Sequence, residues 1–234
     1  MAQRTVVPKA FTFPVPAGVN DDVAAAIVNP AVSAWLALSS RAKLARGENV
    51  LILGATGITG RLAVAIAKLL GAARVVAAGR NEQILDSLLH LGADSIIQLD
   101  RPAEDVQQSI LREAGESGFQ VVLDYLWGRP TETFLAAITN RKFAAIGSEV
   151  RLVQAGESAG PTISLPAAVL RSTALTILGT AGIPDLTVLQ NAVHQVLAYA
   201  ASGRLHVETS RIPLASIEAA WDQDPQGRRI VIIP

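Results

Sequence analysis

The sequence predicts an α/β protein built on a doubly wound parallel sheet with helices on both faces. Short runs that are apolar throughout alternate with amphipathic segments from residue 49 onward, as expected for strands buried between two layers of helices. The first such run, NVLIL at 49–53, leads directly into the glycine-rich stretch GATGITG at 54–60. Half of the 234 residues are hydrophobic and 17% are charged, which is typical of a compact globular chain.

The first 48 residues lack this alternation. Prolines at positions 8, 14 and 16 predict irregular or edge-strand chain at the start. Two helical stretches are expected next. They are NDDVAAAIV at 20–28, with Asn20 or Asp21 as the N-cap, and NPAVSAWLALSSRAKL at 29–44.

The alternating part assigns each later element. Strands are expected at 49–53, 74–78, 95–99, 119–124, 143–147 and 175–179, and helices at 57–70, 81–91, 103–114, 130–139, 165–171 and 184–201. In the first helix, Leu62, Ile66, Leu69 and Leu70 fall on one face. After Gly203 the tail holds two strand-like pieces around a short helix.

The glycine-rich stretch fits a dinucleotide-binding turn of the form A-x-G-x-x-G over residues 55–60. Gly57 would let the backbone approach a pyrophosphate, while Gly60 would let the helix pack close to the sheet. The motif follows a strand and opens a helix, which is the context that it requires. The alternative is a helix–strand contact that merely needs small residues. The sequence therefore predicts a Rossmann-type domain whose dinucleotide meets Ala55, Thr56, Gly57, Ile58 and Thr59.

The end of the second strand favours NADP(H) over NAD(H). An NAD site normally places an acidic residue there to accept hydrogen bonds from the ribose hydroxyls, whereas this chain has Gly79, Arg80 and Asn81. Without the carboxylate a 2′-phosphate meets no repulsion, and Arg80 could supply a charge-assisted partner. The alternative for Arg80 is a solvated loop residue.

Composition excludes several other classes of function. Lys plus Arg and Asp plus Glu balance at 20 each, so no long-range field would recruit nucleic acid or an anionic membrane. The absence of cysteine removes disulfides, thiolate metal sites and a Cys nucleophile. We expect no metal site, no signal peptide and no membrane span, and therefore a soluble cytoplasmic protein.

The order of segments resembles the medium-chain dehydrogenase/reductase superfamily, and within it the zinc-independent quinone oxidoreductase-like branch. The resemblance covers essentially the whole chain and rests on the segments at 45–60, 118–128, 170–180 and 203–234, together with LGAD at 91–94. It implies three parts. Residues 1–40 would be a remnant of a catalytic, GroES-like domain with lead-in helices, 41–203 an NADP-binding domain, and 204–234 a return segment of the catalytic domain. Most of that GroES-like domain is expected to be missing.

The resemblance also implies further cofactor contacts at the ends of the later strands. These would be Tyr125 and Leu126, Gly147 and Ser148, and Gly179 and Thr180. Ordinary loop packing is the alternative for each. Quinone reductases of this type often have a Tyr and a Lys near the 2′-phosphate, but the matching positions here are Leu99 and Ile84. Arg80 would thus carry that charge alone.

Other candidate residues have structural explanations. His90, His194 and His206 show no mutual metal-ligand spacing. Asp124 is expected to bond a loop or cap a helix, and Glu132 and Asp185 to favour helix N-termini. Short-chain dehydrogenases also carry GATGxxG, but the residues four after the two tyrosines are Arg129 and Gly203, not Lys.

The resemblance implies an NADPH-dependent oxidoreductase that passes hydride to a quinone or an activated alkene, with no catalytic acid identifiable. A non-catalytic NADPH-binding protein, or an isolated cofactor domain, is the alternative. The apolar strand at 174–180 should lie at a sheet edge, since only a helix and the tail follow it. An unprotected edge of this kind favours pairing with a second copy, so we expect a homodimer through this strand.

Overall fold

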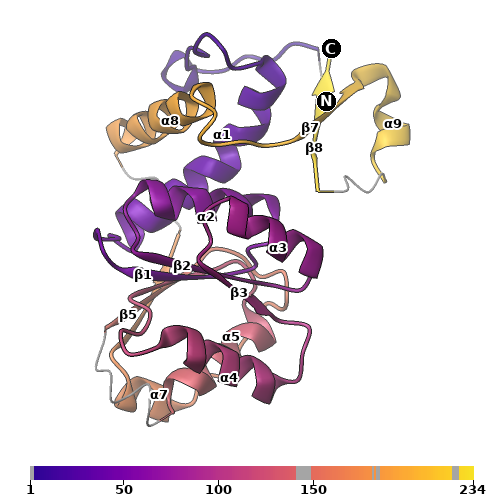
Figure 1. The fold of residues 1–234 in the computed structure, drawn as a ribbon. Coiled ribbons are helices and arrows are strands. Elements are labelled where there is room, and N and C mark those ends of the chain that lie inside the picture. Colours follow the sequence, from indigo (N-terminus) through magenta and orange to yellow (C-terminus); the bar gives the residue numbers. More distant parts are fainter. Residues whose placement is uncertain (1–2, 141–148, 181, 183–184, 223–226) are drawn as a thin grey trace. The chain divides into compact units, whose positions relative to one another are not determined.

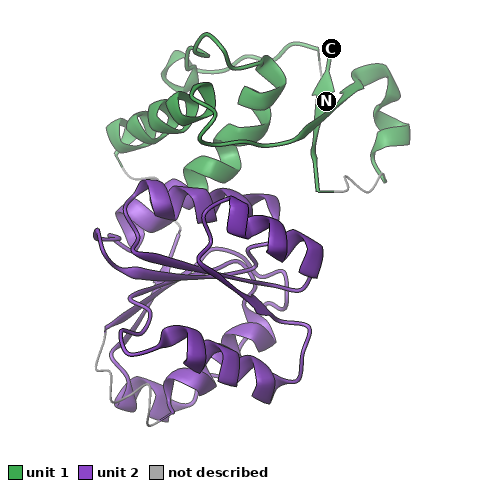
Figure 2. Ribbon diagram, viewed as in Figure 1, with its two compact units in different colours: residues 1–33, 183–234 green, residues 34–182 purple. Residues whose placement is uncertain are grey.

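The computed structural model describes residues 3–140, 149–180, 182, 185–222 and 227–234. The chain forms two compact units (Figure 2). One consists of residues 34–182, and the other combines residues 1–33 with 183–234. These bounds differ from the expected cofactor domain at 41–203, because the helix expected at 184–201 belongs to the unit that contains the two terminal segments.

Unit 34–182 is built on a six-stranded parallel sheet (Figure 1). Its strands are β1 (Asn49–Leu53), β2 (Arg74–Gly79), β3 (Ser95–Gln98), β4 (Val121–Asp124), β5 (Val150–Gln154) and β6 (Leu175–Gly179). Their order is β3-β2-β1-β4-β5-β6, so the strand order reverses between β1 and β4. In open α/β sheets, the carboxyl edge at such a switch point is where ligands bind.

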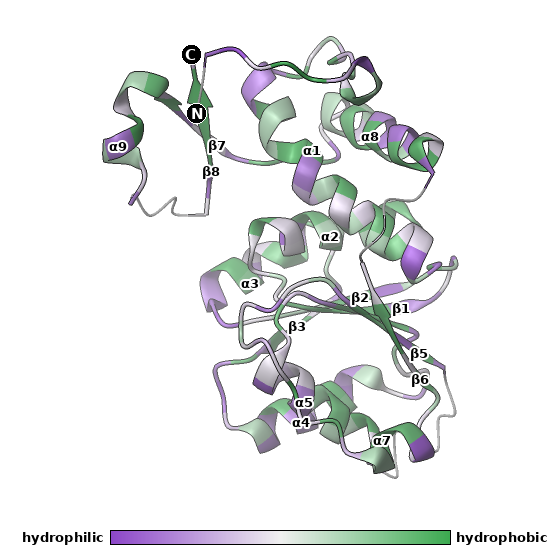
Figure 3. Cartoon of the chain, turned by 180° about the vertical axis from the view of Figure 1, so that it is seen from behind, coloured by the Kyte–Doolittle hydropathy of each residue, from purple (hydrophilic) through white to green (hydrophobic). Residues whose placement is uncertain are grey.

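Helices cover both faces of this sheet (Figure 1). Helices α2 (Ile58–Leu69) and α3 (Glu82–His90) lie on one face, and α4 (Ala103–Ala114), α5 (Gly128–Ile138) and α7 (Ala167–Ser172) on the other. Strands β1, β2 and β4 are buried almost throughout, and hydrophilic residues gather at the ends of helices such as α3 (Figure 3). The predicted α/β class is confirmed.

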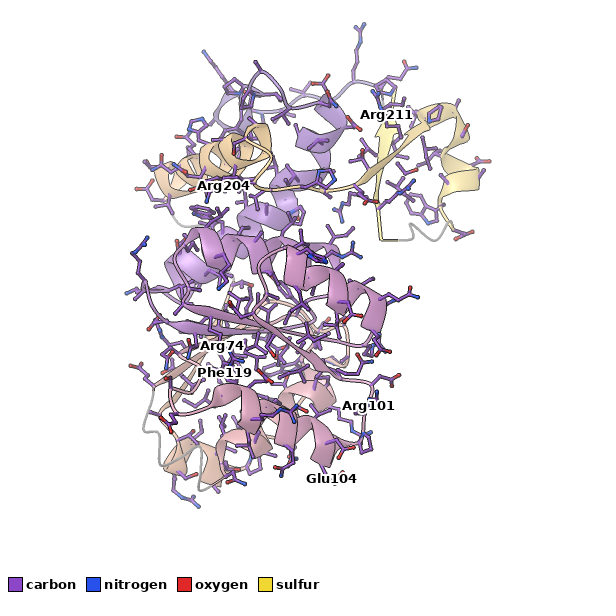
Figure 4. All side chains as sticks on the ribbon, in the orientation of Figure 1. Arg74, Arg101, Glu104, Phe119, Arg204 and Arg211 are labelled. Atoms are coloured by element: carbon purple, nitrogen blue, oxygen red, sulfur yellow. The ribbon has the colours of Figure 1, made fainter. Side chains whose placement is uncertain are left out.

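A core of apolar side chains fills the space between the sheet and its second helical layer. Phe119 and Phe134 are fully buried in it, together with Ile110 of α4 and Leu152 of β5. Phe119 lies between the sheet and α4 (Figure 4). Nearby, the Arg74 guanidinium forms an ion pair with Glu113, which closes the amino end of β2 against α4. The Arg74–Glu113 pair thus lies at the edge of the sheet opposite the carboxyl ends of the strands, where the candidate site lies.

The fifth strand of the sheet is Val150–Gln154, and the expected strand at 143–147 lies outside the described residues. Register identifies β5, since Leu123 of β4 pairs with Val153 and Val153 pairs with Leu178 of β6. The carboxyl end of the fifth strand is therefore formed by Ala155 and Gly156. Gly147 and Ser148, expected at this end, lie outside the described residues as well.

The two expected helices near the start are one helix, which corrects the sequence interpretation. Helix α1 runs from Asp21 to Leu36 with Pro30 inside it, and continues as a π-helical turn to Arg41. Among the described residues, this 21-residue helix is the one that is long and apolar enough to cross a membrane, contrary to our expectation of none. Half of it is buried inside the chain, as in core helices of water-soluble proteins.

The other unit contains the amino-terminal segment, α8 (Leu186–Ala201) and a small two-stranded parallel sheet of β7 (Thr209–Pro213) and β8 (Arg229–Ile233). Helix α9 (Ile217–Ala220) lies between these two strands in the sequence, as expected for the tail. Thr209 donates a hydrogen bond to Asp22 at the start of α1 over 2.7 Å. The ring of Phe13 meets that of His194 edge-on.

Candidate functional site

The turn after β1 is held in place by the neighbouring strand. The amides of Gly54 and Ala55 both donate to the carbonyl oxygen of Ala78 at 2.9 Å. Gly54 has a positive φ of 88°, a conformation that favours glycine. Gly57 then forms the N-cap of α2 without a side-chain hydrogen bond. The first amides of α2, including those of Ile58 and Thr59, have no acceptor inside the helix, so they are available to an anion.

The three glycines of this region serve different purposes. A Cβ atom placed on Gly60 would lie 2.3 Å from the Gly54 carbonyl oxygen, and one on Gly79 would lie 2.4 Å from the Thr56 Cγ2 atom. These two glycines therefore permit close packing of the turn. A Cβ on Gly57 would meet only the Gly54 oxygen, at an ordinary 3.6 Å. The absence of a side chain at Gly57 thus leaves open space in front of the helix N-terminus.

That space belongs to a cavity of about 310 Å³ at the carboxyl edge of the sheet. It lies at the switch point, since its walls come from the ends of β1, β2, β3 and β4 and from the loop after β5. The lining residues are Gly54, Thr56, Gly57, Ile58, Thr59, Gly60, Gly79, Arg80, Leu99, Tyr125, Leu126 and Ser158. A smaller cavity of about 190 Å³ shares Leu99 and is lined by Arg101 and Arg129. Arg101 extends from the loop after β3 (Figure 4).

The far wall of the cavity is organised by the buried carboxylate of Asp124. Its Oδ1 atom accepts hydrogen bonds from the amides of Leu126 (2.8 Å) and Trp127 (3.0 Å), and its Oδ2 atom accepts one from the Thr131 hydroxyl. Burial raises the pKa of Asp124, and this effect outweighs the three hydrogen bonds, each of which lowers it. The expected loop-bonding role of Asp124 is confirmed.

The loop after β5 locks onto the loop after β4. The amides of Ala155 and Gly156 donate to the Asp124 carbonyl oxygen, and the amide of Ala159 donates to that of Leu126. The Ser158 hydroxyl donates to the Tyr125 carbonyl oxygen at 3.1 Å. A Cβ on Gly156 would come within 2.7 Å of that same oxygen, so glycine is required for this close approach.

Tyr125 carries a polar atom that the protein does not satisfy. Its hydroxyl is buried and has no hydrogen-bond partner among the described residues, and burial raises the pKa of the phenol. Leaving a buried hydroxyl unpaired costs free energy. Tyr125 lines the cavity, but its hydroxyl oxygen is buried, so other atoms of the residue form the wall. The free helix N-terminus at this cavity fits an anionic ligand such as a dinucleotide.

The structure brings together most, but not all, of the predicted contact residues. Eight of them line the cavity: Thr56, Gly57, Ile58, Thr59, Gly79, Arg80, Tyr125 and Leu126. Ala55 is fully buried behind the turn, and the Asn81 side chain caps α3 by accepting from the amide of Ile84 at 3.0 Å. Gly179 is the last residue of the edge strand β6 and Thr180 follows it, and neither residue lines the cavity.

Sequence reasoning missed other residues of the site. Ser158 and Gly156 follow the true fifth strand, which the apolar run at 143–147 obscured. Leu99, which the resemblance placed near the 2′-phosphate without assigning it a contact, lines the same cavity as Arg80. Arg61 in the first turn of α2 donates from Nε to the Thr56 carbonyl oxygen at 3.0 Å. The detectable signal was its position: a cation in the first turn of a helix is unusual, because the positive end of the helix dipole repels it.

The remaining candidates have structural roles. Asp185 caps α8 by accepting from the Thr187 amide at 3.0 Å, and Glu132 accepts from the Ser164 amide at 2.6 Å. His194 contacts the Phe13 ring. Within the described ranges, no group of three His, Cys, Asp or Glu residues is placed to hold a metal ion.

Comparison with known proteins identifies the family. A family model described as "Zinc-binding dehydrogenase" matches residues 59–199, a range that includes strands β2 to β6 and all of α2 except its first residue. The chain belongs to the zinc-binding dehydrogenase family. Within the medium-chain dehydrogenase/reductase superfamily, it falls in the zinc-independent quinone oxidoreductase-like branch, so the resemblance seen in the sequence is confirmed.

Individual relatives and a solved structure show how far the likeness extends. The chain is 28% identical over 221 residues to the "Probable NADPH-dependent quinone reductase tdiC" of Emericella nidulans, covering 90% of this chain and 61% of the relative. It is 24% identical to "Quinone oxidoreductase-like protein 2" of Rattus norvegicus, covering 91% of this chain and 59% of the relative. The crystal structure of AibC superposes with a TM-score of 0.78 at 26% identity, covering 94% of this chain and 62% of that one. The chain thus spans about three fifths of the length of these three proteins.

Proposed function

We propose that this chain binds NADPH and belongs to an oxidoreductase that transfers hydride from the nicotinamide to a quinone or an activated alkene. The observation that carries the proposal is the open space in front of Gly57, bordered by the free amides of α2 and by Arg80. A nicotinamide cofactor agrees with the names of the chain's relatives, of which one is described as a probable NADPH-dependent quinone reductase.

The residues at the cavity define how the cofactor would be held. The amides of Ile58 and Thr59 would bind the pyrophosphate, which is stabilised there by the helix dipole. Gly57 would leave the space for it.

The preference for NADPH rests on the end of β2. No acidic side chain stands at Gly79, Arg80 or Asn81. The Asn81 side chain is already engaged in capping α3, so Arg80 is the side chain left to meet a 2′-phosphate. Arg80 lines the cavity and forms no ion pair within the described part of the chain. A guanidinium binds phosphate through paired, charge-assisted hydrogen bonds.

In this chemistry the bound nicotinamide supplies a hydride, and the acceptor also takes up a proton. The chain's own contribution is to fix the cofactor and exclude water on the side of the sheet. The interlocked loops after β4 and β5 provide a rigid wall for that purpose. We assign no residue of the cavity as the donor of that proton.

The proposal is tested with the purified chain in two steps. Titration calorimetry should show binding of NADPH, and oxidation of NADPH should then be followed with a panel of quinones and α,β-unsaturated ketones. Turnover with any of these acceptors supports the oxidoreductase. Binding without turnover supports the alternative, a non-catalytic NADPH-binding protein or isolated cofactor domain. Failure to bind NADPH overturns the proposal.

We further propose a soluble, cytoplasmic homodimer that has no nucleic-acid or membrane partner. The support for the dimer is the position of β6 at the edge of the sheet, where Leu175, Ile177 and Leu178 are half-buried and Thr176 is exposed. Pairing of β6 with its copy across a two-fold axis would satisfy the open backbone groups of that edge.

A further inference from the structure

Arg61 occupies an electrostatically unfavourable position. It lies in the first turn of α2, where the helix dipole and the free amides already create positive potential. The N-cap Gly57 offers no side chain to the helix, and the first turn contains no acidic residue. Nothing within α2 itself therefore offsets the added charge of Arg61.

The structure nevertheless holds Arg61 in place. The side chain is half-buried, and its Nε–H donates to the Thr56 carbonyl oxygen at 3.0 Å. It makes no ion pair with any carboxylate in the described part of the chain. Such an arrangement is favourable when an anion is bound nearby, because the anion stabilises the dipole, the amides and the guanidinium together.

Thr56 connects Arg61 to the end of β2. Its Cγ2 atom lies so close to Gly79 that a Cβ there would come within 2.4 Å, and Arg80 is the next residue. The turn is thus fixed at three points: the Ala78 carbonyl oxygen, the contact with Gly79, and the hydrogen bond from Arg61. Arg61 does not itself line the cavity, so it acts through Thr56 and through its charge.

We propose that Arg61 is a positioning and specificity residue for the phosphorylated adenosine end of the cofactor, acting together with Arg80. This inference rests on the proposed function. Arg61 fixes the turn that carries Thr56 and adds a second positive charge to the region between α2 and β2. Since NADPH carries an additional phosphate, it gains more from that charge than NADH does.

The test is the affinity of the full chain for NADPH and NADH, measured by titration calorimetry at low and high salt. Arg61→Met should weaken NADPH about tenfold, the effect of losing a charge-assisted interaction, and NADH much less. The loss of NADPH affinity caused by Arg61→Met should be smaller at high salt, because salt screens the charge interaction. Arg61→Lys, which keeps the charge, should restore most of the NADPH preference. Arg112→Met is the matched control, since this arginine of α4 is 70% exposed.

Other outcomes separate this inference from the proposed function. If wild type binds neither nucleotide, the proposed function is wrong, and the role of Arg61 is wrong with it. If wild type prefers NADPH but Arg61→Met leaves the ratio of affinities unchanged, only the inference about Arg61 is overturned. Equal weakening of both nucleotides at every salt concentration would make Arg61 a purely structural residue and would also overturn it. If Arg61→Met does not fold, loss of the preference in a folded Arg61→Lys decides against the inference.

Discussion

The Thr131 hydroxyl donates a hydrogen bond to Oδ2 of Asp124, which joins the first turns of α5 to the end of β4. The other carboxylate oxygen holds the amides of Leu126 and Trp127. Trp127 has φ 55° and ψ −158°, a backbone region that is almost restricted to glycine. Three hydrogen bonds to one carboxylate therefore stabilise a strained loop that lines the cofactor cavity.

Asp124→Ala should destabilise the chain strongly. The substitution leaves two amides and the Thr131 hydroxyl without their acceptor, and each unsatisfied buried group costs about 1–3 kcal/mol. Asp124→Asn keeps Oδ1 as an acceptor for both amides, so its loss should be much smaller. Urea denaturation of both variants checks this. Equal losses for Ala and Asn would show that the amide bonds to Oδ1 do not hold the loop.

The stability contributed by Asp124 should depend on pH. Because burial raises its pKa in the folded chain above the ordinary value of 3.8, the folded state binds more protons than the unfolded state between these two pKa values. Stability attributable to this group therefore falls as pH rises through that window. The difference in unfolding free energy between wild type and Asp124→Asn should shift in favour of wild type as the solution is acidified. A difference that is independent of pH would contradict the raised pKa.

Gly57 and Gly60 should respond in opposite ways to substitution. A Cβ at Gly57 meets no protein atom closer than 3.6 Å, and the residue has an ordinary φ of −73°, so the Gly57→Val apoprotein should melt near the wild-type temperature while stabilisation by NADPH is lost. Gly60→Ala forces a Cβ against the Gly54 backbone, and overpacking of this kind costs about 1–3 kcal/mol or more. Thermal denaturation with and without NADPH distinguishes the two. A Gly57→Val chain stabilised by NADPH like wild type would show that the turn serves packing alone.

Arg80→Ala should remove most of the preference for NADPH over NADH. A charge-assisted hydrogen bond contributes about 1.5–3 kcal/mol, so wild type should bind NADPH at least about tenfold more tightly. Calorimetric titration of both nucleotides measures this, with Arg112→Ala as a control on the surface of α4. Equal affinities of wild type for the two nucleotides would refute the assignment of Arg80.

Strand β6 should mediate dimer formation. Ile177→Pro removes a backbone donor in the middle of the edge strand, so it should yield monomer or aggregate where wild type is a dimer. Analytical ultracentrifugation over a range of concentrations measures the assembly, and circular dichroism checks that the variant is folded. A wild-type chain that sediments as monomer even when concentrated would exclude this interface.

The local pattern of apolar and turn residues was sufficient to predict most of the fold and the glycine turn at the centre of the site. The glycine turn and five strands of the sheet follow from apolar runs bounded by turns. The sequence placed the fifth strand at 143–147 because that run is apolar throughout, whereas Val150–Gln154 contains Arg151 and Gln154. Pairing with β4 and β6 identifies Val150–Gln154 as the fifth strand of the sheet. Two helices were expected at 20–28 and 29–44, but tertiary packing joins them, since Ala26 and Ala31 on either side of Pro30 are buried in one continuous helix. The unusual position of Arg61, a cation in the first turn of a helix, was visible in the sequence, but its hydrogen bond to the Thr56 carbonyl oxygen is seen only in the structure.

The walls of the cofactor cavity come from two halves of the sheet. The glycine turn follows β1 in one half, and the interlocked loops follow β4 and β5 in the other. Tyr125 and Ser158, which the loops bring together, are 33 residues apart in the sequence. A partial opening of β4, β5 and β6 would remove this wall while the glycine turn stayed folded, and such openings require less free energy than global unfolding. The amide of Ala159, which donates to the Leu126 carbonyl oxygen, should therefore exchange with deuterium faster than the amides of β1. A bound nucleotide that touches both halves should slow exchange at Ala159 more than at any position inside β1.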